Sequence, residues 1–230
     1  MTSPYSRSRR RFTTFALLGT VLPAWADEAP LSSVAPRWRA SFAAFEAADR
    51  ARPVAPGGVV FVGSSSIRGW ENLETQFDLS PPPLNRGFGG STLAECARHL
   101  DRLVLPYRPR LVVLYAGDND LAAGDTPRQV LNSYLAFVDG VHRALPATRI
   151  AFIAIKPSPS RARLLHRVRQ ANMLVRHHAA GDARLAYIDV FTPMLGPDGQ
   201  PRPQLFQPDA LHLNARGYAL WRELIAPVLR

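Results

Sequence analysis

A serine, a histidine and an aspartate, residue types that together can do nucleophilic chemistry, occur in two short stretches far apart in the chain. Ser65 is the middle one of three serines in "VGSSSIRGW", and Asp209 precedes His212 by three residues in "PDALHLN". A serine hydroxyl is a weak nucleophile that needs a base within hydrogen-bond reach. The base in turn needs a carboxylate that fixes its tautomer and stabilises its cation. Ser65, His212 and Asp209 can supply these three roles.

Two turns between these stretches contain donors suited to a developing negative charge on oxygen. The turns are "GFGGS" (87–91) and "GDND" (117–120). An oxyanion requires preorganised hydrogen-bond donors, and the N–H groups of Ser65 and Gly90 and the side-chain amide of Asn119 are of that kind. Each stretch taken alone is ordinary turn chemistry, so the functional interpretation rests on their occurrence together.

Short apolar runs precede these polar residues and are typical of strands in a covered parallel sheet. They are rich in β-branched residues and apolar on both faces. We expect strands at 58–63, 111–117, 149–155 and 185–190, with a shorter one around 83–90.

Amphipathic segments alternate with these runs and are predicted to be helices. They lie at about 33–51, 91–103, 127–144, 160–180 and 215–229. Ser91 and Asn214 are suited to cap two of the helices, and Pro127 to begin a third. The alternation predicts a three-layer α/β/α sandwich with a central parallel sheet. In such folds sites form outside the carboxyl ends of the strands, which is where the polar stretches stand.

The polar stretches resemble the four blocks of the SGNH (GDSL-type) hydrolases, a family named for its invariant Ser, Gly, Asn and His. The blocks are "FVGSSSI", "NRGFGGST", "YAGDND" and "DALHLN", and they occur in the family's order. The resemblance extends over about 58–229. It implies a flavodoxin-like three-layer fold, hydrolysis of esters and no cofactor.

The same resemblance implies a role for each site residue. Ser65 would be the nucleophile, with Asp209 and His212 completing the triad. Gly90 and Asn119 would be oxyanion donors beside the N–H of Ser65.

The first block departs from the family's usual Gly-Asp-Ser, because Ser64 stands where the aspartate would be. We assign Ser65 as the nucleophile because it keeps the family's spacing from Gly63. Trp70 then falls where family members carry an aromatic residue. Ser66 is the less favoured alternative.

The first 26 residues have the features of an export signal, which leaves a single domain at 27–230. A basic "RSRRRF" is followed by an apolar stretch and by the small-x-small cleavage site Ala24-Trp25-Ala26. The apolar stretch is shorter than the roughly 20 residues that span a bilayer. The arginines also resemble the twin-arginine signature, so two export routes stay open. Both predict a periplasmic or secreted protein without stable membrane insertion after signal cleavage.

Charge and cysteine content exclude some classes of function. The formal net charge of +10 falls to +6 once the signal's four arginines (Arg7, Arg9, Arg10 and Arg11) are removed, and no nucleic-acid partner is indicated. The single cysteine, Cys96, excludes an intramolecular disulfide. No Cys/His cluster has zinc-ligand spacing, so no metal is expected.

Two basic features near the middle of the chain have alternative interpretations. The histidine- and arginine-rich segment 161–178 is either a contact for an anionic surface or, as we favour, a solvated helix face. In "IKPSPS", Lys156 and Ser158 follow a strand and are candidates to line the cleft, although its prolines also favour a plain loop.

Together these features predict an exported serine esterase that forms an acyl-enzyme on Ser65. The expected substrate is a small-molecule or polymer-borne oxygen ester, such as an acylated sugar or a lysophospholipid. Two alternatives remain: an acyltransferase that uses the same triad, and a non-catalytic carbohydrate-binding module.

Overall fold

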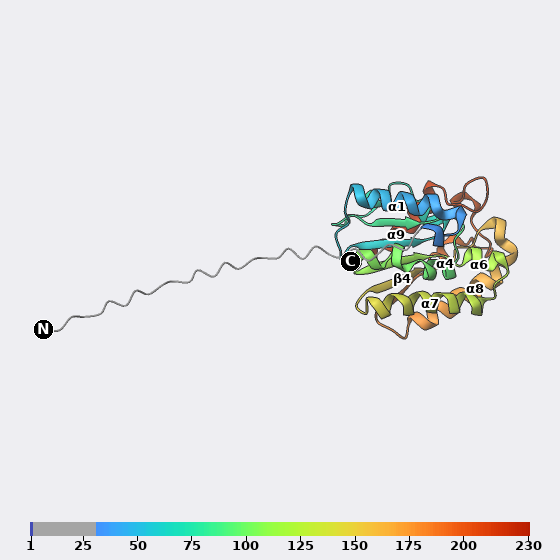
Figure 1. The fold of residues 1–230 in the computed structure, drawn as a ribbon. Coiled ribbons are helices and arrows are strands. Elements are labelled where there is room, and N and C mark those ends of the chain that lie inside the picture. The colour runs from blue at the N-terminus through green and yellow to red at the C-terminus, as the bar shows by residue number, and fades with distance from the viewer. Residues whose placement is uncertain (2–30) are drawn as a thin grey trace.

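Five parallel strands form one central sheet in the computed structural model, which describes Met1 and residues 31–230 (Figure 1). The export signal predicted at 1–26 therefore lies outside the described residues apart from Met1. The strands are β1 (Val59–Gly63), β2 (Leu84–Gly87), β3 (Leu111–Tyr115), β4 (Arg149–Ile153) and β5 (Leu185–Ile188). Their order across the sheet is β2-β1-β3-β4-β5, and every neighbouring pair is parallel. The predicted fold class is confirmed.

The central strands are buried on both faces, as their uninterrupted apolar runs predict. Every residue of β1 and β3 is buried. Several strands end earlier than their apolar runs do, because residues such as Ala116 and Ala154 already turn out of the sheet at its carboxyl edge. The core thus continues under the loops that carry the polar stretches.

Helices cover both faces of the sheet. Phe152 on β4 packs edge-on against Tyr134 of α7 (Pro127–Ala144) with ring centroids 5.3 Å apart. Tyr115 follows Leu114, the register partner of Phe152, so its side chain points to the opposite face. There it packs against Trp221 of α9 (Ala215–Ile225) at 4.9 Å. The helices α4 (Leu93–Arg98) and α8 (Leu165–Ala179) lie beside α7.

Helix α1 (Arg39–Ala51) packs along the β2 edge of the sheet (Figure 1). Phe42 meets Phe88 at 5.3 Å, and the buried guanidinium of Arg86 on β2 pairs with Asp49. The hydroxyl of Tyr107 also donates to Asp49, at 2.7 Å. The edge strand is therefore covered by a helix that comes before it in the chain.

Of the five predicted helices, only 127–144 forms one unbroken α-helix. The segment 33–51 includes a 3₁₀ helix (Pro36–Trp38) before α1, and 215–229 ends as a 3₁₀ helix (Ala226–Leu229) after α9. The segment 91–103 divides into α4 and α5 (Leu100–Leu103), and 160–180 begins as a 3₁₀ helix (Pro159–Leu164) before α8. Three short helices have no counterpart in the sequence prediction: α2 (Ser65–Arg68), α3 (Leu73–Gln76) and α6 (Asp118–Ala123). Along α8, Val168 and Val175 face inward while His177 and His178 are exposed, which fits the solvated-face interpretation.

The predicted helix caps are partly correct. Asn214 caps α9 by accepting hydrogen bonds from the N–H groups of Arg216 and Gly217. Pro127 begins α7, with Thr126 as its cap. The prediction of Ser91 as a cap is wrong, because Thr92 caps α4 in a capping box with Glu95.

Candidate active site

Strand β1 leads directly into the short helix α2, which begins at Ser65. Gly63 makes this tight passage possible, since a Cβ there would overlap the carbonyl oxygen of Tyr115 on β3. Ser64 completes the connection by donating its N–H to that carbonyl at 3.0 Å. As the first residue of the helix, Ser65 has an N–H with no acceptor inside the helix and none elsewhere in the described chain.

Of the three serines, Ser65 is the one whose hydroxyl lies within hydrogen-bond distance of the His212 imidazole. Its Oγ lies 3.0 Å from Nε2 of His212, although 147 positions separate the two residues in the chain. Ser64 and Ser66 are almost fully buried, with exposed fractions of 1% and 0%. Their hydroxyls therefore lie beneath the site and do not face the imidazole.

Asp209 holds the other side of the imidazole. Its Oδ2 lies 2.5 Å from Nδ1 of His212, and its Oδ1 accepts the N–H groups of Leu211 and His212 at 2.9 Å each. The hydrogen bonds from His212 and from Leu211 lower the pKa of the Asp209 carboxyl to about 2. A proton on Nδ1 is thereby favoured, which leaves Nε2 free to accept the proton of the Ser65 hydroxyl. Serine, histidine and aspartate thus form one hydrogen-bonded row.

The loop that carries this histidine is anchored on both sides. Asn214 donates through Nδ2 to the carbonyls of Gln204 and Phe206, at 3.0 and 2.9 Å. On α9, the hydroxyl of Tyr218 donates to the carbonyl oxygen of Ser66 at 3.0 Å. The start of α9 is therefore tied to the helix that bears the nucleophile candidate.

Gly90 stands in a turn whose backbone only glycine adopts readily. The N–H of Ser91 closes the turn on the carbonyl of Phe88 at 3.4 Å, and Gly90 has φ = +76°. Within the described chain, no acceptor takes the N–H of Gly90. This N–H is therefore available to a bound ligand.

Asn119 lies beside that turn with its amide held at both ends. Its Nδ2 donates to the carbonyl of Ser91 at 3.0 Å, and its Oδ1 accepts from Nη2 of Arg161 at 2.9 Å. An amide nitrogen has two hydrogens, so one remains free after the bond to Ser91. The structure thus places Gly90 and Asn119, the two predicted oxyanion donors, next to each other at the carboxyl edge.

A buried ion network supports Asn119 from beneath. Asp118 accepts from Lys156 at 3.0 Å and pairs with Arg161 at 3.1 Å, and Lys156 also donates to the hydroxyl of Tyr115 at 3.0 Å. Burial alone would raise the pKa of Asp118, but the two cations outweigh it and hold that pKa below its ordinary value. The sequence suggested Lys156 and Ser158 as cleft-lining residues, and this is wrong because both are buried.

Asp120 links the start of α6, which contains Asn119, to the start of helix α4. Its Oδ1 accepts the N–H of Leu93 at 3.0 Å, and its side chain is fully buried. Burial raises the pKa of its carboxyl to about 6. Neither Asp120 nor Arg161 could be assigned from the sequence, because each finds its partner in a distant segment.

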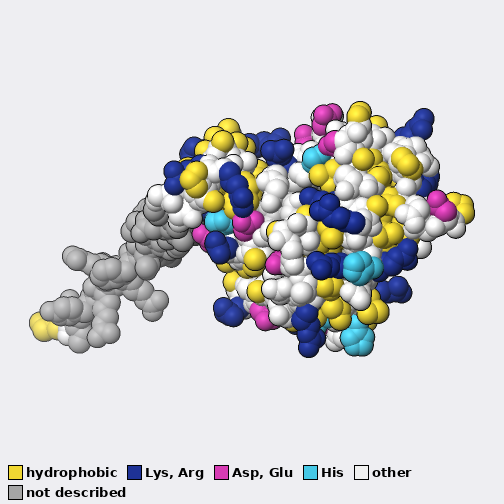
Figure 2. All heavy atoms as spheres, turned by 90° about the vertical axis from the view of Figure 1, so that its right-hand side faces the viewer, with side chains coloured by type: hydrophobic (Ala, Val, Ile, Leu, Met, Phe, Trp, Pro, Cys, Tyr) yellow, Lys and Arg dark blue, Asp and Glu magenta, His cyan; other side chains and the backbone are white. Residues whose placement is uncertain are grey.

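These residues lie at the carboxyl edge of the sheet, the side marked by α6 in Figure 1. Figure 2 views that face, on which basic side chains are more prominent than acidic ones. The side chains of His212 and Asp209 are 37% and 46% exposed, so the row reaches solvent.

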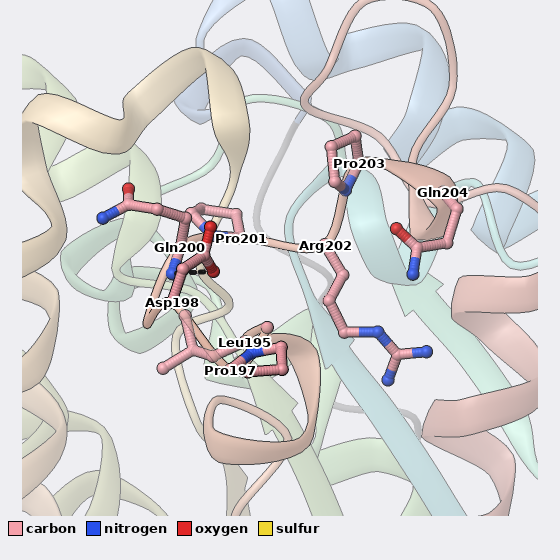
Figure 3. Close-up of a pocket in the computed structure, with 9 residues that line it drawn as sticks. Leu195, Pro197, Asp198, Gln200, Pro201, Arg202, Pro203 and Gln204 are labelled. Carbon is pink, nitrogen blue, oxygen red and sulfur yellow. Dashed lines mark hydrogen bonds between the residues drawn. The ribbon is translucent and has the colours of Figure 1, made fainter.

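The loop between β5 and α9 forms a separate open hollow of about 560 Å³ (Figure 3). It is lined by Leu195, Gly196, Pro197, Asp198, Gln200, Pro201, Arg202, Pro203 and Gln204. Within it, Oδ1 of Asp198 accepts the N–H of Gln200 at 3.0 Å. None of the residues in the Ser65–His212–Asp209 row lines this hollow.

The described residues contain neither a metal-binding cluster nor a membrane-spanning helix. Among them, no group of three or more His, Cys, Asp or Glu residues is arranged to hold a metal ion. In the same part of the chain, every helix is too short or too polar to cross a membrane.

Solved structures with similar folds come from several bacteria. A Streptococcus pneumonia protein described as a platelet activating factor matches with a TM-score of 0.75 at 20% identity, over 84% of this chain and 93% of that one. A GDSL-like lipase from Bacteroides thetaiotaomicron gives 0.67 at 20% identity, over 82% and 98%. A lipase/acylhydrolase from Enterococcus faecalis gives 0.57 at 22% identity, over 75% and 95%. At these identities the likeness shows the fold.

Comparison with curated proteins gives no match. The model of the GDSL-like Lipase/Acylhydrolase family, however, matches residues 61–220, which include Ser65, Gly90, Asn119, Asp209 and His212. The chain belongs to the GDSL-like lipase/acylhydrolase family.

Proposed function

We propose that this hydrolase is a serine esterase that cleaves oxygen esters through an acyl-enzyme on Ser65. The single observation that carries the proposal is the row of hydrogen bonds from Ser65 Oγ through His212 to Asp209, at 3.0 and 2.5 Å. Such a row activates a hydroxyl that is otherwise a weak nucleophile.

In the first half of the reaction, Ser65 Oγ attacks the ester carbonyl carbon while Nε2 of His212 takes its proton. Asp209 stabilises the resulting imidazolium. The carbonyl oxygen becomes an oxyanion, which the N–H groups of Ser65 and Gly90 and the free amide hydrogen of Asn119 stabilise. When the tetrahedral intermediate collapses, His212 protonates the departing alkoxide and the acyl group stays on Ser65.

In the second half, His212 takes a proton from water as the water oxygen attacks the acyl carbon. Collapse of this second intermediate returns the proton to Ser65 Oγ and releases the carboxylic acid. An acyltransferase would differ only here, with an acceptor hydroxyl in place of water. The exposure of His212 and Asp209 favours esters whose alcohol is small or belongs to a polymer at the protein surface.

Hydrolysis of a p-nitrophenyl ester series from acetate to decanoate, by residues 27–230, tests the proposal. Ser65→Ala is expected to lower kcat by about 10³-fold or more, with Ser64→Ala as the matched control that stays active. Equal activity in Ser65→Ala and the native enzyme would disprove the mechanism. Less free acid on addition of a sugar acceptor, at equal p-nitrophenol release, would assign the transferase outcome instead.

We further propose that the protein is exported and that its signal ends at Ala26. The basic, apolar and small-x-small succession at 1–26 supports this. N-terminal sequencing of the protein recovered from the periplasm or medium of a bacterial host is expected to begin at Asp27. Recovery of the full chain from the cytoplasm alone would contradict export.

A further inference from the structure

The peptide unit that bears the Gly90 N–H is held by a side chain from outside the four sequence blocks, that of Trp38. Its indole Nε1–H donates to the carbonyl oxygen of Gly89 at 2.9 Å. This oxygen and the N–H of Gly90 belong to the same trans peptide, in which they point in opposite directions. The hydrogen bond therefore aims the Gly90 N–H away from Trp38.

This orientation matters because the turn at Phe88–Ser91 has two conformers of similar shape. With φ = +76° at Gly90 the turn is of type II. The type I conformer rotates the central peptide by roughly half a turn. It would exchange the Gly90 N–H for the Gly89 carbonyl oxygen, and a carbonyl oxygen repels an oxyanion where an N–H stabilises it.

Trp38 is itself held firmly at the start of α1. Its side chain is 3% exposed and meets Phe88 edge-on with ring centroids 5.2 Å apart. The guanidinium of Arg37 lies 4.0 Å from the indole centroid and pairs with Glu95 at 2.9 Å. A donor fixed in this way selects one turn conformer before any ligand binds.

We propose that Trp38 is a positioning residue for ester hydrolysis, which keeps the Gly90 N–H directed at the oxyanion. This inference rests on the proposed function, in which Gly90 is an oxyanion donor. Since that donor acts in the transition state, the loss of its orientation lowers kcat and leaves KM nearly unchanged.

The first test compares Trp38→Phe with Trp70→Phe. Both substitutions keep an aromatic ring at a site that is 3% exposed. Trp38 loses its hydrogen bond to Gly89, whereas the Trp70 indole N–H has no acceptor within the described chain. Trp38→Phe is expected to lower kcat about 10-fold with KM within about two-fold, and Trp70→Phe to stay within about two-fold of native in both.

The second test does not depend on hydrolysis. In ¹H–¹⁵N spectra of ¹⁵N-glycine-labelled protein, Trp38→Phe is expected to shift or broaden the Gly90 amide signal, while Trp70→Phe leaves it in place. A native kcat together with an unmoved Gly90 signal in Trp38→Phe would overturn the proposal. An equal loss of kcat in both variants would overturn it too.

The two tests also separate this inference from the proposed function. If the native enzyme hydrolyses esters and Trp38→Phe does so equally well, only the role of Trp38 fails. If the native protein hydrolyses no ester although the Gly90 signal depends on Trp38, the esterase proposal fails and the catalytic role of Trp38 fails with it.

Discussion

The guanidinium of Arg161 donates to Oδ1 of Asn119 at 2.9 Å, and this contact fixes which end of the amide faces the site. Oxygen and nitrogen of an asparagine amide are otherwise nearly interchangeable in shape. Because Arg161 has no acceptor atom, it bonds only the oxygen, and the NH₂ group must lie on the other side. Arg161 therefore sets the direction of a predicted oxyanion donor.

Arg161→Met is accordingly expected to lower kcat about 10-fold with little change in KM, because Asn119 acts on the transition state. Steady-state kinetics on p-nitrophenyl acetate measures the effect. Arg163→Met is the matched control, since Arg163 is an exposed neighbour on the same 3₁₀ helix. A KM effect of similar size in Arg161→Met would indicate substrate binding instead of positioning.

Lys156→Met is expected to destabilise the fold by about 2–4 kcal/mol, because it leaves the buried Asp118 carboxylate with one cation fewer. Urea unfolding measures the loss. The double variant Lys156→Met/Asp118→Asn is expected to be more stable than the sum of its single changes by about 1–3 kcal/mol. Simple additivity would contradict an energetically coupled pair.

Asp120→Asn is expected to change how stability depends on pH. The folded-state pKa of Asp120 is about 6, above its ordinary value of 3.8. Its contribution to stability is therefore fully present below pH 3.8 and is lost as the pH rises through about 6. Since asparagine does not titrate, the variant should gain on the order of 2–3 kcal/mol relative to native between pH 4 and pH 8.

Urea unfolding of both proteins at the two pH values measures this difference. Asp125→Asn is a suitable control for the loss of a nearby negative charge. Parallel pH profiles for the native protein and Asp120→Asn would contradict the raised pKa.

Ser64→Ala is expected to leave stability within about 0.5 kcal/mol of native and kcat within about three-fold. The Ser64 hydroxyl is buried and has no hydrogen-bond partner in the described chain, so alanine removes no bond. Ser64→Asp, which restores the family's usual block, is expected to destabilise because the new carboxylate would be buried without a partner. Thermal melting compares the two, and a stabilised Ser64→Asp would show that the position still accommodates the acid.

The strands and the five motif residues could be predicted from the sequence. The residues that hold the motif residues in place could not. Apolar runs such as "VVFVG" predict a covered sheet from their own composition, and a parallel topology brings their carboxyl ends together. The sequence does not predict the short helices α2 and α6, because segments of four to six residues are too short to show helical periodicity.

Lys156 illustrates the other limit. A lone lysine after a strand suggests a residue that faces the cleft, yet its ammonium is buried, where it bonds Tyr115 at the end of β3 and Asp118 at the start of α6. Trp38 and Arg161 likewise act through partners 51 and 42 positions away. Such pairings depend on tertiary packing, which the local pattern of residues does not encode.

The contact between Ser65 and His212 closes a loop of 147 positions, and the Tyr218–Ser66 hydrogen bond secures it from the last helix. Contacts of such long sequence separation are expected to form late in folding, since loop closure must precede them. Because turnover requires this closed contact, we expect heating to abolish enzymatic activity no later than it unfolds the sheet.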